Sequence, residues 1–138
     1  ITPASGYVGP GGALVIGILA GFVCYHATVF LKQRLKVDDS LDVFPVHGVG
    51  GALGTLLAAV FASAGLGVFS GQGLAEGMTI ASQFQVQLIG VLASGVYTAI
   101  VTFVLLKLID RMLGLRVSQD EETEGLDLTQ HNERGYDL

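Results

Sequence analysis

Three long apolar runs constrain the fold of this chain most strongly. The runs extend over residues 11–31, 43–62 and about 84–107, and they contain no Asp, Glu, Lys or Arg apart from Lys107 at the last position. The hydrocarbon core of a bilayer is about 30 Å thick, and roughly 20 residues of α-helix cross it. A helix also satisfies its own backbone hydrogen bonds in lipid. We therefore predict an all-α, polytopic transmembrane helical bundle.

The distribution of charge supports a membrane protein. Charged residues make up 14% of the 138 residues, whereas soluble domains carry about 25%. The net charge of -5 argues against nucleic-acid binding, and acidic residues concentrate in residues 117–138. Cys24 is the only cysteine, so we expect neither a disulfide framework nor a thiolate metal site.

The punctuation of the chain suggests three regions. Residues 1–10, with several glycines and prolines, are interpreted as the end of a preceding helix and a connection. Residues 11–116 hold the three spans, and residues 117–138 form the C-terminal tail. Because the sequence starts at Ile1 without an initiator Met, we expect it to be the C-terminal part of a longer membrane protein, whose missing portion supplies another wall of any polar pathway.

Basic residues predict the orientation. They follow the first and third spans, whereas the glycine-rich connector 63–79 has no Lys or Arg; the basic residues are Lys32, Arg34, Lys36, Lys107, Arg111 and Arg116. Positive charge in short loops marks the cytoplasmic side. The connector is therefore predicted to lie on the outer side of the cell membrane, and the acidic tail is predicted to lie on the cytoplasmic side. In bacteria, this membrane is the inner membrane.

Carboxylates and a proline mark the start of the second span. We expect Asp42 or Ser40 to cap this helix, and Pro45 falls in its first turn, where a missing N–H removes no hydrogen bond. Asp38 and Asp39 are more often caps than catalysts in such a position, and they suit the positive end of a helix.

Glycines suggest close helix packing in the second span. Gly48, Gly50, Gly51 and Gly54 lie within seven positions, although each glycine costs roughly 1 kcal/mol inside a helix. Close approach of a neighbouring backbone is the usual compensation in lipid. We expect the stripe Gly50-x-x-x-Gly54 to face a matching stripe at positions 17 and 21 of the first span.

His47 is the ionisable residue that stands out within the second span. Such residues inside a membrane are expensive and commonly functional. Burial would favour the uncharged imidazole, which offers one donor and one acceptor to a small polar solute. The alternative is a core histidine bonded to a backbone carbonyl.

The remaining polar residues carry weaker signals. His26 lies near the end of its span, and His131 lies in the tail; neither is spaced from His47 as metal ligands would be. Gln83, Gln85 and Gln87 line a vestibule or sit at the membrane interface. We find no phosphate-binding loop, nucleophile elbow or zinc-protease motif, and we expect neither an enzyme nor a cofactor.

The segment before and within the second span strongly resembles the ammonium transporter (Amt/Mep/Rh) family. The resemblance extends over essentially the whole chain, which is similar to the C-terminal portion of a bacterial-type ammonium channel, the last three of eleven helices. The segments that carry it are Asp38-Asp39-Ser40-Leu41-Asp42-Val43-Phe44-Pro45-Val46-His47-Gly48-Val49-Gly50-Gly51, Ile1-Thr2-Pro3-Ala4, Ala75-Glu76-Gly77, Gly114-Leu115-Arg116-Val117 and Glu124-Gly125-Leu126-Asp127.

The resemblance implies a homotrimer in membrane lipid with one narrow, apolar pore per subunit. His47 matches the second of two paired pore histidines, Val43 a position near the inner exit, and Thr2 a polar position beside the pathway. Asp39 and Asp42 match the acids that open the pore-histidine helix. The partner histidine and the outer ammonium site belong to the part that is missing here.

Two positions depart from the family pattern, because Pro45 and Asn132 stand where glycine is usual. The tail resembles a C-terminal region that packs on the cytoplasmic face and takes part in regulation, in many bacteria through P-II signal proteins. The function implied is transport of ammonium as ammonia through a histidine-lined pore. Two alternatives are an ammonium sensor that uses the same membrane core and an Rh-type channel for ammonia or carbon dioxide.

Overall fold

The computed structural model describes residues 1–136, and these residues form helices, turns and loops without a β-strand. Three helical segments are long and apolar enough to cross a membrane: Pro10–Leu35, Phe44–Phe61 and Ile80–Leu113. The predicted all-α fold class with membrane-length helices is confirmed. The chain divides into two compact units, Ile1–Gly95 and Val96 onwards.

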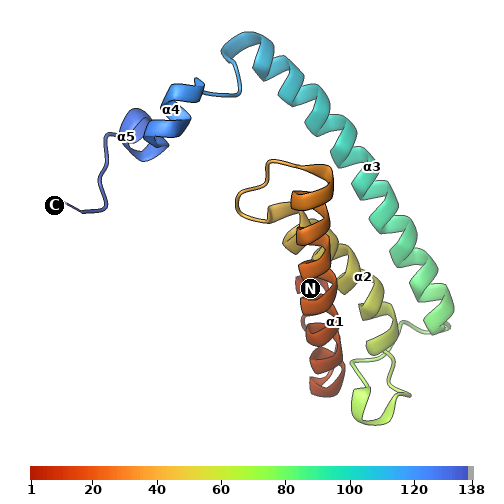
Figure 1. Ribbon diagram of the computed structural model, residues 1–138. Coiled ribbons are helices and arrows are strands. Elements are labelled where there is room, and N and C mark those ends of the chain that lie inside the picture. Colours follow the sequence, from red (N-terminus) through yellow and green to blue (C-terminus); the bar gives the residue numbers. More distant parts are fainter. Residues whose placement is uncertain (137–138) are drawn as a thin grey trace. The chain divides into compact units, whose positions relative to one another are not determined.

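The first unit contains most of the helical elements (Figure 1). Two of them are π-helical turns, η2 and η3, in which the helix is locally wider than an α-helix. The elements in order are the 3-10 turn η1 (Thr2–Ala4), α1 (Pro10–Val29), η2 (Phe30–Leu35), η3 (Phe44–Val49), α2 (Gly50–Phe61), the 3-10 turn η4 (Gly67–Phe69) and the start of α3 (Ile80–Leu113).

The buried faces of α1 and α2 consist mostly of small residues spaced four apart. On α1 the buried positions are Gly12, Ile16 and Ala20, and on α2 they include Gly50, Gly54 and Ala58. Residues with this spacing lie on one helix face. A Cβ on Gly12 would meet Phe61 at 3.0 Å, and one on Gly50 would meet Cys24 Sγ at 3.0 Å. The start of α1 therefore packs on the end of α2, as expected for antiparallel neighbours.

The expected pairing of the glycine stripes is wrong. Gly17 and Gly21 have nothing within 4 Å of the position that a Cβ would take. Gly54 instead packs on the backbone of Ile1, whose Cα would lie 2.6 Å from such a Cβ. The reason is that α1 carries small residues on two faces, and the face with Gly12, Ile16 and Ala20 is the one that meets α2.

The connector after α2 folds back on the start of α1. The Gln72 N–H donates to the Tyr7 carbonyl over 2.8 Å, and the Gly73 N–H donates to the Ala62 carbonyl over 2.6 Å. A Cβ on Gly71 would collide with the backbone of Tyr7, Phe61 and Ala62. Glycine is thus required at this crossing.

The second unit holds the rest of α3 and two short helices, α4 (Gln119–Glu124) and α5 (Leu126–His131). Helix α4 begins with a capping box, in which the Ser118 hydroxyl accepts from the Glu121 N–H and the Glu121 carboxylate accepts from the Ser118 N–H. Asn132 ends α5 in a left-handed conformation, with a φ of 52°. Asparagine is one of the few residues other than glycine that tolerates this conformation.

Helix α3 extends beyond the expected range 84–107 at both ends. Polar residues such as Gln83 and Arg111 continue the backbone hydrogen bonding of the apolar run, and the helix stops before Gly114, whose φ is 78°. The tail expected at 117–138 contains α4 and α5, and its last two positions lie outside the described residues.

Candidate functional site

Asp39 caps the second membrane-length helix. Its carboxylate accepts hydrogen bonds from the Val43 N–H over 2.9 Å and from the Phe44 N–H over 2.8 Å. The capping role considered for Asp38 and Asp39 is therefore confirmed for Asp39, whereas the expectation that Asp42 or Ser40 caps this helix is wrong. The loop brings Asp39 beneath the first turn because Asp42 adopts a left-handed conformation with a φ of 55°.

The same hydrogen bonds favour the charged form of Asp39. They lower the pKa of this carboxyl below its ordinary value of 3.8, with the Phe44 N–H as the largest cause, the Val43 N–H second and the Lys32 charge a smaller one. Asp39 therefore carries its negative charge at the positive end of the helix at any pH near neutrality.

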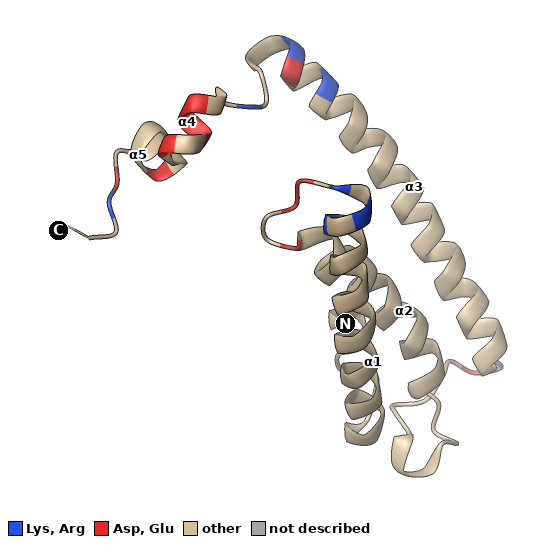
Figure 2. Ribbon diagram, in the orientation of Figure 1, with Lys and Arg blue, Asp and Glu red and all other residues tan. Residues whose placement is uncertain are grey.

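Asp42 pairs with a lysine of the preceding helix. The Lys32 Nζ lies 2.8 Å from the Asp42 Oδ1, and their side chains are 41% and 33% exposed. An exposed ion pair contributes only about 0–1 kcal/mol to folding. The importance of this pair is its position, because it ties η2 to the start of η3. Figure 2 shows the charged residues of this loop gathered at one end of the apolar helices.

His47 lies in the π-helical turn η3, one turn beyond the cap. Pro45 is fully buried in the same turn, and its missing N–H leaves no donor to satisfy. The His47 side chain is exposed on the surface of this segment, as are Phe44 and Val46 on either side of Pro45. The burial of the His47 side chain in a dry passage therefore remains a prediction.

The other expected pathway and packing residues lie around this helix. Val43 is the residue before η3 and is 52% exposed, whereas Thr2 lies in η1, which packs on α2, and is also exposed. Gly50 and Gly54 face Cys24 and Ile1, but Gly51 has nothing within 4 Å of a Cβ position. Its packing role remains a prediction.

The remaining histidines are separate from this site. The His26 ring contacts the Phe22 and Tyr25 rings edge-on, at centroid distances of 4.4 and 5.3 Å. His131 lies in α5 of the second unit. Within residues 1–136, no three His, Cys, Asp or Glu side chains gather as ligands for a metal ion.

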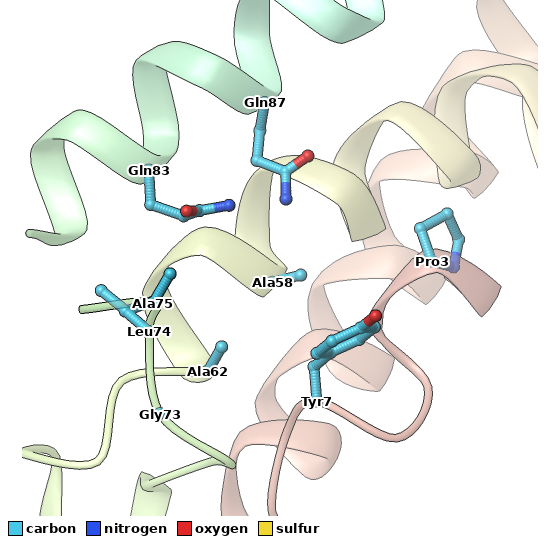
Figure 3. A pocket seen from close by; sticks show the side chains of 9 residues that line it. All are labelled: Pro3, Tyr7, Ala58, Ala62, Gly73, Leu74, Ala75, Gln83 and Gln87. Atoms are coloured by element: carbon cyan, nitrogen blue, oxygen red, sulfur yellow. The ribbon is translucent and has the colours of Figure 1, made fainter. Parts of the chain in front are cut away.

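A pocket of about 330 Å³ opens between the connector, α2 and the first turns of α3 (Figure 3). Gln83 and Gln87, one helical turn apart, point into it together with Tyr7, and alanines such as Ala58 and Ala62 form part of its wall. Of the three glutamines considered from the sequence, Gln83 and Gln87 line this pocket and Gln85 does not.

Two features of the site were not anticipated from the sequence. The π-helical geometry around His47 has no signature in hydrophobicity, although the neighbouring Pro45 and Gly48 mark an irregular turn. The pairing of Lys32 with Asp42 matches no sequence motif, because the two residues lie ten positions apart on either side of the loop. The spacing between two charges across a short loop could have suggested it.

Comparisons with known proteins agree on one family. The model of the Ammonium Transporter Family matches residues 1–136. A putative ammonium transporter of Methanothermobacter thermautotrophicus is 45% identical over 139 residues, covering 100% of this chain and 34% of the relative. Ammonium transporters of Bacillus subtilis and Archaeoglobus fulgidus are 40% and 41% identical over 136 residues, covering 99% of this chain and 33% and 34% of those relatives. The chain thus spans about one third of the length of these curated relatives.

Proposed function

Since the chain belongs to the ammonium transporter family, we propose that the full-length protein containing this segment transports ammonium across a membrane. The observation that carries this proposal is the family match over residues 1–136, with His47 inside the second apolar helix of the match. The relatives are named transporters, which favours transport over a sensor or an enzyme.

The proposed mechanism passes ammonia, rather than the ammonium ion, along His47. Burying an isolated cation in a low-dielectric passage costs far more than burying a neutral molecule that forms hydrogen bonds. Ammonium therefore leaves its hydration shell and a proton at the outside, and neutral imidazole exchanges hydrogen bonds with the ammonia that passes. Val43 would lie towards the inner exit and Thr2 beside the path.

The exposed face of His47 supports a pathway that needs a second wall. Phe44, Val46 and His47 all present exposed side chains on this segment. An ionisable side chain within a membrane helix almost always faces the protein interior or a water-filled cavity. We propose that the rest of the polypeptide covers this face. No metal ion or cofactor is required for this chemistry.

Orientation, assembly and regulation follow the same proposal. The basic residues that follow α1 and α3 favour a cytoplasmic position for these helix ends and for the tail in a cell membrane, the inner membrane in bacteria. The small-residue faces and exposed apolar surface suit contacts with lipid and with other subunits of a homotrimer. The tail helices α4 and α5 are the proposed site of regulation, including a P-II signal protein.

The two histidines of this segment allow a matched test. The purified full-length protein is reconstituted in vesicles, and ammonium and methylammonium fluxes are measured for wild type, His47→Ala and His26→Ala. We expect His47→Ala to change flux by about tenfold and to alter selectivity, in the range that a lost hydrogen-bonding group costs. His26→Ala should resemble wild type. Unchanged flux and selectivity in His47→Ala would remove the pathway role.

A further inference from the structure

The ion pair between Lys32 and Asp42 joins the two π-helical turns at one end of the apolar helices. Lys32 belongs to η2, and Asp42 immediately precedes the helix that continues into η3. We propose that Lys32 is a positioning residue for His47, because it fixes Asp42 and thereby the register of η3. This inference rests on the proposed transport function and deepens it.

The backbone hydrogen bonds explain why Asp42 sets the start of the helix. Val43 and Phe44 donate to the Asp39 carboxylate, Pro45 has no N–H, and the Val46 N–H donates to the Asp42 carbonyl over 3.0 Å. The early donors of the helix thus depend on two loop residues. The backbone of Asp42 is in a left-handed conformation. In this conformation its Oδ1 is shielded from solvent and lies 2.8 Å from the Lys32 Nζ.

The π-helical turn makes His47 sensitive to this anchor. Successive residues of an α-helix are rotated by about 100° around the helix axis, so a change of register by one residue would turn an imidazole away from its path. π-helical turns are rare, and they occur frequently at functional sites. Here Pro45 is buried and η3 packs on α1, while the Lys32–Asp42 pair holds the open end.

Neighbouring basic residues provide a control for charge. Arg34 lies in the same turn as Lys32 and is exposed, and among residues 1–136 the structure records no ion pair for it. Removing either residue lowers the positive charge of this loop by the same amount. Only the loss of Lys32 releases Asp42.

The test uses the full-length protein in vesicles and separates maximal flux from the half-saturating ammonium concentration. The variants are Lys32→Met, which keeps the apolar stem, Lys32→Arg, Asp42→Asn and Arg34→Met. We expect Lys32→Met and Asp42→Asn each to lower maximal flux by about tenfold, as small displacements of functional groups do. The half-saturating concentration should not change, and the double variant should be no worse than either single one.

Lys32→Arg should retain transport because it restores the pair, and Arg34→Met should resemble wild type. A Lys32→Met protein equal to Arg34→Met would overturn the positioning role while ammonium transport stands. If Lys32→Met fails to reach the membrane, Asp42→Asn decides, and normal maximal flux in that variant overturns the proposal. A wild-type protein that carries no ammonium at all would remove both the proposed function and this inference.

Discussion

The Asp39 carboxylate interacts with both the backbone dipoles and a nearby positive charge at the start of the second membrane-length helix. It accepts two backbone N–H groups at the start of the helix that carries His47, and Lys32 adds a smaller favourable charge. Hydrogen bonds to the charged form lower a carboxyl pKa and thus couple folding to pH. The charged Asp39 carboxylate therefore stabilises the start of this helix.

The substitution Asp39→Asn tests this coupling. The Val43 and Phe44 N–H groups donate to different oxygens of the carboxylate, and asparagine replaces one of these oxygens with an NH2 donor. One N–H group therefore loses its acceptor, and we expect the melting temperature of the full-length protein at pH 7 to fall by a few degrees. The pKa of Asp39 is lowered in the folded state, so its contribution is present above its ordinary value of 3.8 and is lost as the pH falls through the folded value.

The difference in melting temperature between wild type and Asp39→Asn should therefore shrink as the pH falls below about 4. Asp38→Asn is the neighbouring comparison, since Asp38 accepts neither of these two backbone hydrogen bonds. A difference that is constant from pH 7 to pH 3 would show that Asp39 acts without its charge.

At the scale of the helices, the faces that pack are made mostly of small residues. Gly12, Ile16 and Ala20 of α1 face α2, while Gly54 of α2 packs on the backbone of Ile1. An alanine at Gly54 would place its Cβ 2.6 Å from the Ile1 Cα, so η1 would have to move. Overpacking of this kind costs typically about 1–3 kcal/mol.

We predict that Gly54→Ala lowers the thermal stability of the full-length protein in detergent. Gly17→Ala is the matched variant, because it adds the same methyl group to a helix interior where nothing lies within 4 Å in this segment. Alanine is more favourable than glycine inside a helix by up to about 1 kcal/mol, so the stability of the Gly17→Ala protein should be equal to or higher than that of wild type. Equal losses in the two variants would contradict the packing assigned to Gly54.

The membrane-length helices could be predicted from the sequence, but the details of the site could not. Three long apolar runs were sufficient to predict three helices that are long and apolar enough to cross a membrane. Hydrophobicity does not distinguish an α-helical turn from a π-helical one, so the π-helical geometry of η3 could not be predicted. The choice of Asp39 over Asp42 as the cap depends on the left-handed backbone of Asp42, and the contacting face of α1 depends on packing against α2.

At the scale of the whole molecule, this segment presents one side of a proposed pathway. Its charged loop, cap, π-helical turn and histidine follow one another along the second helix, while the chain covers about a third of the length of its relatives. The exposed His47 face is consistent with completion by the remaining polypeptide. The account depends on this face being enclosed when the protein is whole.

The most direct test is an experimental structure of the full-length protein in a lipid nanodisc. We predict that the His47 ring is enclosed by protein, in a narrow passage between this segment and the rest of the polypeptide, with apolar side chains around it. A His47 ring that points into lipid, or that lies in bulk water, would contradict conduction past this residue.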